Sequence, residues 1–190
     1  MGLTKVLLIA LAVTSGVARG ADAPGSMPNE ITVAGRSLVL NGTGLRVATF
    51  LHVHVYVAGL YVEHPSSDPV RILASREAKR LVMHFVRHVD HDDIVKAWNE
   101  GFRSNATVPI AQIQPMIDQL DAWTPTFHDG DTLTFTYVPG MGVSVDYNGV
   151  RKGVIASEDF ARSLFAVWLG PKPPTEELKR GLLGHHPEAR

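Results

Sequence analysis

The sequence predicts an α+β fold, with helices packed over an antiparallel sheet. Segments rich in β-branched and aromatic residues come in blocks along the chain instead of alternating one by one with helices. Two of these segments are joined by Asn148-Gly149, the dipeptide that most favours a tight hairpin. Other segments place apolar residues three and four apart, which is the spacing of an amphipathic helix. A parallel wound sheet would require strands and helices to alternate.

Extended segments dominate the first part of the chain. Residues 31–40 are expected to form a hairpin around Gly35, and Asn41-Gly-Thr-Gly44 is expected to form a turn. From Leu45 to Val62 the composition predicts one long extended segment. The apolar face of that segment carries Leu51, Val53, Val55 and Val57. In residues 81–86 an apolar face alternates with a face that carries Val82, His84 and Val86, which predicts a strand buried on both sides.

The second part of the chain predicts a meander followed by helices. The meander comprises residues 132–138, 143–147 and 150–155. Capping residues mark the starts of the helices, and glycine marks two of their ends. The expected helices run from Asp68-Pro69 to Ala74, from Asp90 to about Arg103, over Ile110 to Leu120 with Pro115 as a kink or boundary, from Ser157 to Leu169, and from Thr175 to Leu183.

The first twenty residues have the pattern of a cleavable export leader. Lys5 gives a basic start, residues 6–13 form a short apolar core, and Ala18-Arg19-Gly20 offers small residues at a cleavage site. The expected divisions are a signal peptide over 1–20, a flexible lead-in over 21–30, one domain over 31–184 and a tail over 185–190. We expect a periplasmic or secreted protein. No membrane anchor is expected after cleavage, because the apolar run is shorter than the ~18 residues that span a bilayer.

Composition limits the classes of function. The chain has 190 residues and no cysteine, which excludes disulfides, cysteine nucleophiles and cysteine metal sites. With 45% hydrophobic residues, a single domain can bury an adequate core. Loss of the leader removes Lys5 and Arg19 but no acid, so the net charge changes from −1 to −3. Because Lys and Arg form no cluster, nucleic-acid binding is not expected.

Patterns that carry chemistry are few. The histidines that could enter a metal site are His52, His54, His84, His88 and His91. His52 and His54 lie on one strand face and would need a third ligand from another strand, such as His84. Beside His88 and His91, the acids Asp92 and Asp93 are explained by the start of a helix. The sequence therefore predicts no metal site. It also lacks a Gly-x-Ser-x-Gly elbow and an HExxH helix, so no catalytic residue is assigned.

An ordered series of segments resembles the chalcone isomerase-like family over about Gly35 to Gly184. The segments are Asn41-Gly-Thr-Gly-Leu-Arg46, Ala58-Gly-Leu-Tyr-Val-Glu63, Gly130-Asp-Thr-Leu133, Tyr147-Asn-Gly149, Val167-Trp-Leu-Gly170 and Leu178-Lys-Arg-Gly-Leu-Leu183. The resemblance implies an antiparallel sheet with helices packed over it and a ligand cleft between them. It also implies the bacterial branch of the family, which consists largely of exported proteins of unassigned activity.

The same resemblance implies which residues face the cleft. Plant members with isomerase activity hold the substrate with an Arg, a Thr, a Tyr, an Asn and a further Thr or Ser. The Arg corresponds to Arg46 and the Asn to Asn99. The strand Thr corresponds to Tyr56, the Tyr falls near Asp92, and the last hydroxyl corresponds to Val167. The expected ligand-binding residues are therefore Arg46, Tyr56, Asn99 and Val167.

These differences favour binding over catalysis. Acid–base and oxyanion catalysis need particular donors, and three of the five are changed, so flavonoid cyclisation is not expected. A cleft that keeps Arg46 and loses hydroxyls suits a small apolar or amphipathic molecule with an anionic end, such as a fatty acid or haem. The alternatives are an isomerase (intramolecular lyase) acting on an unknown phenolic or enone substrate, and a partner-binding module with a filled interior.

Two geometric conditions decide whether such a cleft exists. A straight strand would separate Arg46 from Tyr56 by about 33 Å at ~3.3 Å per residue, so the chain must bend or form a hairpin near Thr49 to Leu51. Otherwise Arg46 would form only a salt bridge at the rim. The helix after Ser157 carries an apolar stripe of Phe160, Leu164, Val167 and Trp168. Val167 then lies either at the cleft wall or in a sealed core.

Overall fold

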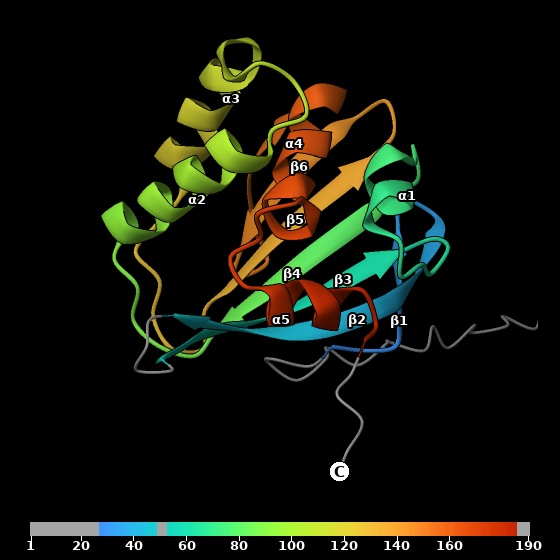
Figure 1. Ribbon diagram of the computed structural model, residues 1–190, viewed down its shortest axis with the longest axis horizontal. Helices are drawn as coiled ribbons and strands as arrows, with labels where there is room; N and C mark the ends of the chain where they lie inside the picture. The colour runs from blue at the N-terminus through green and yellow to red at the C-terminus, as the bar shows by residue number, and fades with distance from the viewer. Residues whose placement is uncertain (1–26, 49–52, 186–190) are drawn as a thin grey trace, which may run out of the picture.

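The strands pair in the order in which they occur in the chain. A computed structural model describes residues 27–48 and 53–185, and every pair of neighbouring strands in it is antiparallel (Figure 1). The sheet contains β1 (Glu30–Val33), β2 (Arg36–Ala48), β3 (Val53–Val62), β4 (Lys79–Phe85), β5 (Thr132–Val138), β6 (Gly142–Tyr147) and β7 (Val150–Ile155). The predicted antiparallel α+β architecture is confirmed. The expected leader over 1–20 lies outside the described residues.

Helices cover one face of this sheet. They are α1 (Pro69–Ala74), α2 (His91–Asn105), α3 (Ile110–Trp123), α4 (Glu158–Leu169) and α5 (Glu176–Leu182). Three helices start at the predicted caps, because the side chains of Asp68, Ser157 and Thr175 accept hydrogen bonds from backbone N–H groups in the first turn. Figure 1 shows α2, α3 and α4 on the same side of the sheet, and α5 alongside β2. None of the helices in the described ranges is long and apolar enough to cross a bilayer.

The glycine-rich segment before Arg46 is not a turn. It continues β2, with Thr43 opposite Gly59 and Gly44 opposite Ala58 in β3. The glycines serve close packing instead: a Cβ on Gly44 would lie 2.6 Å from the carbonyl oxygen of Leu178 in α5. The predicted turn at 41–44 is therefore wrong, because small residues here give α5 room against the strand.

The predicted continuous strand from Leu45 to Val62 is instead the end of β2 followed by β3. The two strands are antiparallel and place Arg46 directly opposite Tyr56. The required reversal of the chain is thus confirmed, although its expected position near Thr49 to Leu51 lies outside the described residues. A register shift between Arg46 and Val47 adds an extra residue on β3, which is a bulge.

Burial along the central strands also differs from the predicted pattern. In β3 the buried alternation falls on Tyr56, Ala58 and Leu60, whereas Val53, Val55 and Val57 are half-buried. In β4 only one face is fully buried, because Val82 and His84 are half-buried. The helices cover a single face of the sheet, so strands in it alternate between full and partial burial.

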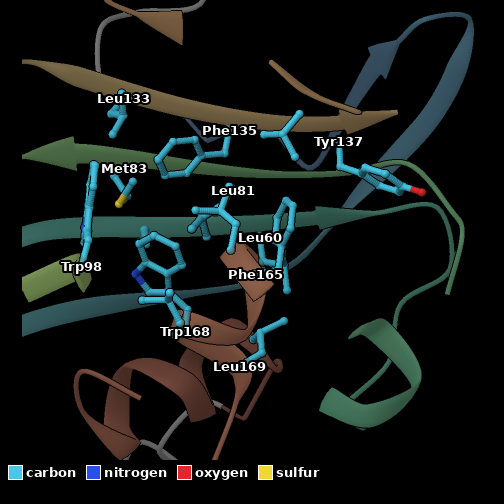
Figure 2. Packing of buried hydrophobic residues seen from close by; sticks show 14 of the residues in the cluster. Leu60, Leu81, Met83, Trp98, Leu133, Phe135, Tyr137, Phe165, Trp168 and Leu169 are labelled. Carbon is cyan, nitrogen blue, oxygen red and sulfur yellow. The ribbon is translucent and has the colours of Figure 1, made fainter. Parts of the chain in front are cut away.

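The core lies between the sheet and α4. Strand residues Leu60, Leu81, Met83 and Phe135 face the buried side chains of α4, which include Trp168 (Figure 2). The α4 stripe of Phe160, Leu164, Val167 and Trp168 is buried throughout. A second, small cluster of Val33, Leu38, Tyr61 and Ala78 lies near β1 and β2. The core does not fill the space beside α2, where β2 ends and β3 begins.

Candidate ligand cavity

A cavity of about 740 Å³ lies between α2 and the ends of β2 and β3. This volume is within the range of roughly 300 to 1,000 Å³ that is typical of small-molecule sites. The apolar part of its wall comes from Val53, Val55, Val89, Ile94, Trp98 and Val167. The sequence therefore folds into a domain with an interior that is not completely filled by its own side chains.

Arg46 and Tyr56 form a polar corner of this cavity. They are cross-strand partners at the bulge, and both line the cavity. The Arg46 guanidinium donates to the carbonyl oxygen of Val47. In the described part of the chain it forms no ion pair with a carboxylate. Its charge therefore has no protein counterion there and remains available to an anion.

The hydroxyl of Tyr56 is oriented by a tryptophan. Trp168 in α4 donates from Nε1 to Tyr56 Oη at 3.0 Å, and Tyr56 is only 4% exposed. Burial raises the pKa of Tyr56 to about 12, although the Trp168 hydrogen bond and the Arg46 charge act in the opposite direction. Tyr56 therefore stays protonated at ordinary pH and presents a hydrogen-bond donor, not a base.

The wall between α2 and α4 depends on one close contact. Val167 and Gly101 both line the cavity, and a Cβ on Gly101 would lie 2.7 Å from Val167 Cγ1. Only glycine allows α2 to approach α4 this closely. Val167 is 2% exposed, so it belongs to both the core and the cavity wall.

A second wall is fixed by Asn105 at the end of α2. Its side chain donates to the carbonyl oxygen of Lys172 at 2.8 Å and accepts from the backbone N–H of Lys172 at 2.8 Å. These two bonds hold Lys172, Pro173 and Pro174 against the cavity. Sequence reasoning missed Asn105, because its partner is 67 residues away and no local pattern marks the pair.

Asn99 lies elsewhere. It is not among the residues that line the cavity; its side chain donates to Asp121 Oδ2 in α3 at 2.8 Å. The structure thus brings together Arg46, Tyr56 and Val167 but leaves Asn99 on another face of α2. Asp92 is fully exposed and also lies outside the cavity. We therefore leave Asn99 out of the site developed below.

Charged side chains surround the cavity mouth. Arg87 and Lys172 are exposed cations there, and Asp93 and Glu100 are exposed acids on α2. His88 lines the same region, and its Nε2 lies 3.1 Å from Asp90 Oδ1. The sequence did not single out this mixed rim. Asp90 also lines the cavity, so its lining contains the cations Arg46, Arg87 and Lys172 and three carboxylates. Among the described residues, none of these carboxylates forms an ion pair with Arg46.

The histidines are dispersed through the described ranges, 27–48 and 53–185. No group of three His, Asp or Glu side chains there is arranged to hold a metal ion. His84 contacts Thr132 Oγ1 at 2.9 Å through Nδ1, and burial lowers its pKa. His54 is exposed, and His52 lies outside the described residues.

Comparisons with known proteins give a family and a fold. A family model described as chalcone isomerase-like matches residues 23–184. The crystal structure of a fatty-acid binding protein from Arabidopsis thaliana is similar to this chain, with a TM-score of 0.65 and 16% sequence identity. The similarity covers 83% of this chain and 90% of that chain, and at this identity it shows the fold alone. A search of curated proteins gave no match.

Proposed function

The chain belongs to the chalcone isomerase-like family, and on that premise we propose that it binds a small apolar ligand through a carboxylate, without transforming it. A fatty acid is the ligand class that fits best. The observation that carries the proposal is the cationic Arg46, without a protein counterion among the described residues, directly opposite Tyr56 in the sheet, with both residues lining one largely apolar cavity.

The chemistry of this corner favours an anion with an apolar tail. A carboxylate accepts hydrogen bonds and offers none, which matches the donors on Arg46 and Tyr56. The tail would replace water against Val53, Val55 and Ile94, and apolar burial would stabilise the complex. The structurally similar Arabidopsis protein is a fatty-acid binding protein, which supports the same ligand class here.

Isomerase activity is less well supported. Intramolecular cyclisation of a phenolic or enone substrate needs groups that position it and accept or donate protons. Because burial raises the pKa of Tyr56 to about 12, its phenol is almost entirely protonated at neutral pH and does not serve as a base, and Asn99 contacts α3 instead of the cavity. Turnover of a chalcone panel by the purified protein would overturn the proposal of binding alone.

Haem is the second ligand that the sequence suggested. His88 is the histidine that lines the described cavity, but it is exposed at the mouth and its Nε2 faces Asp90. Among residues 27–48 and 53–185 no histidine faces the interior of the cavity, and such a lining fits an acyl chain better than a ligated haem iron. We therefore propose a carboxylate ligand, and haem titration followed at the Soret band serves as the comparison.

The test is calorimetric titration of dodecanoate into wild type, Arg46→Met and Arg36→Met. Loss of a charge-assisted hydrogen bond at Arg46 should weaken binding by about 10- to 100-fold. Arg36 is the matched control, because it lies on the same strand but is exposed and pairs with the half-buried Glu63 at 3.0 Å. Equal affinities for wild type and Arg46→Met would contradict the proposed site.

We also propose that the chain is exported, with cleavage of the leader after Gly20. The proposal rests on the basic start and short apolar core of residues 1–20. Expression of the full chain in a bacterium, followed by N-terminal sequencing of the periplasmic fraction, tests it. A mature chain that starts at Ala21 is expected. Full-length protein confined to the cytoplasm would contradict it.

A further inference from the structure

Resting on the proposed carboxylate site, we propose that Trp168 is a positioning residue that makes the site select an ionised carboxylate over a neutral alcohol of the same length. It acts through Tyr56, whose hydroxyl oxygen accepts the indole N–H at 3.0 Å. Trp168 itself lies outside the lining of the cavity, so it exerts this effect without touching the ligand.

The selectivity follows from the number of hydrogen bonds that a phenol can make. A tyrosine hydroxyl donates one hydrogen and accepts at its oxygen. Because Trp168 occupies the acceptor side, Tyr56 offers its hydrogen toward another group, and Arg46 beside it offers only donors. A carboxylate satisfies both residues. An alcohol hydroxyl would also have to donate a hydrogen bond, but the Tyr56 oxygen already accepts one from Trp168.

Packing holds the indole of Trp168 in the required orientation. Trp168 is 1% exposed, and its ring meets Trp98 edge-on at a centroid distance of 6.4 Å and Phe135 at 5.9 Å (Figure 2). Tyr56 is fixed in turn by an edge-on contact with Phe85 at 5.5 Å. Both partners of the hydrogen bond are therefore ordered before a ligand arrives, so little entropy is lost in orienting them.

The experiment compares dodecanoate with dodecan-1-ol in four proteins: wild type, Trp168→Phe, Tyr56→Phe and the double variant. The measured quantity is the ratio of the two affinities. Trp168→Phe should lower the ratio by about fivefold, the worth of one ordinary hydrogen bond. It should have no further effect on the ratio in the Tyr56→Phe background, because the indole acts only through that hydroxyl. Trp123→Phe is the matched control, a tryptophan outside the cavity lining.

A measurement on the wild type covers the case in which Trp168→Phe does not fold. The indole N–H resonance of Trp168 should shift on addition of dodecanoate and shift less on addition of dodecan-1-ol, while the Trp123 resonance stays in place. Equal weakening of both ligands by Trp168→Phe, or an indole resonance that ignores dodecanoate, would overturn the positioning role alone. If wild type binds no dodecanoate, the proposed function fails and this role fails with it.

Discussion

Replacement of Gly101 by alanine should force apart the two helices that enclose the cavity. The new Cβ would lie 2.7 Å from Val167 Cγ1, whereas carbon atoms in ordinary contact are about 3.5–4.0 Å apart. Overpacking of this kind costs about 1–3 kcal/mol, whereas the better helix propensity of alanine returns at most about 1 kcal/mol. We therefore expect Gly101→Ala to lower the free energy of unfolding by about 1 kcal/mol.

A double-mutant cycle separates this contact from other effects. Val167→Ala alone should cost about 2 kcal/mol, because it removes two buried methyl groups. In the double variant the alanine at position 101 gains the vacated space, so the combined loss should fall short of the sum by about 1–2 kcal/mol. Urea unfolding measures each term. If the losses of the two single variants simply add in the double variant, the packing argument is wrong. The control pair is Gly101→Ala with Val154→Ala, whose losses should add because Val154 lies on the edge strand β7.

Three further predictions concern the cavity wall, a buried lysine and the α5 contact. Val167→Thr should change the melting temperature little but alter the affinity for dodecanoate, because a hydroxyl at the cavity wall can reach water or ligand. A large loss of stability with unchanged binding would instead place Val167 in a sealed core. Burial lowers the pKa of Lys79 from 10.5 to about 8, so between these values the folded protein binds fewer protons than the unfolded chain. The free energy of unfolding should then rise by about 2 kcal/mol from pH 7.5 to pH 9.5, and Lys79→Met should abolish the rise; equal slopes for both proteins would disprove this. Gly44→Ala should cost about 1–3 kcal/mol in urea unfolding, since its Cβ would meet the Leu178 carbonyl oxygen; wild-type stability would mean that α5 shifts freely.

Local signals made much of the fold predictable. The caps at Ser157 and Thr175 bond backbone N–H groups within four residues, and the Asn148-Gly149 hairpin needs only a positive φ at its two residues. In both cases all the interacting groups are close together in the sequence, so the local sequence is enough to predict them. The same reasoning failed at Gly42 and Gly44. A glycine pair indicates a turn when its neighbours are local, but here the determining neighbour is α5, far along the chain.

The site was predictable only in part, for the same reason. That Arg46 lies opposite Tyr56 could be predicted, because the family resemblance places both residues in one cleft and therefore requires the chain to reverse between them. The hydrogen bond from Trp168 to Tyr56 joins residues 112 positions apart, and neither residue carries a local mark of it. Asn99 was assigned by position on α2, yet neighbouring positions on a helix face different directions, and its side chain faces Asp121.

The central claim is that a carboxylate lies against Arg46 and Tyr56, and the ionisation state of the bound ligand tests it most directly. The protein is saturated with dodecanoate labelled with ¹³C at the carboxyl carbon, and the carbon resonance is followed from about pH 8 to about pH 5. A cation and hydrogen-bond donors lower a carboxyl pKa, whereas apolar burial raises it. We predict a bound carboxyl that stays ionised throughout this range in wild type and titrates within it in Arg46→Gln. A wild-type resonance that titrates like that of the variant would contradict the account.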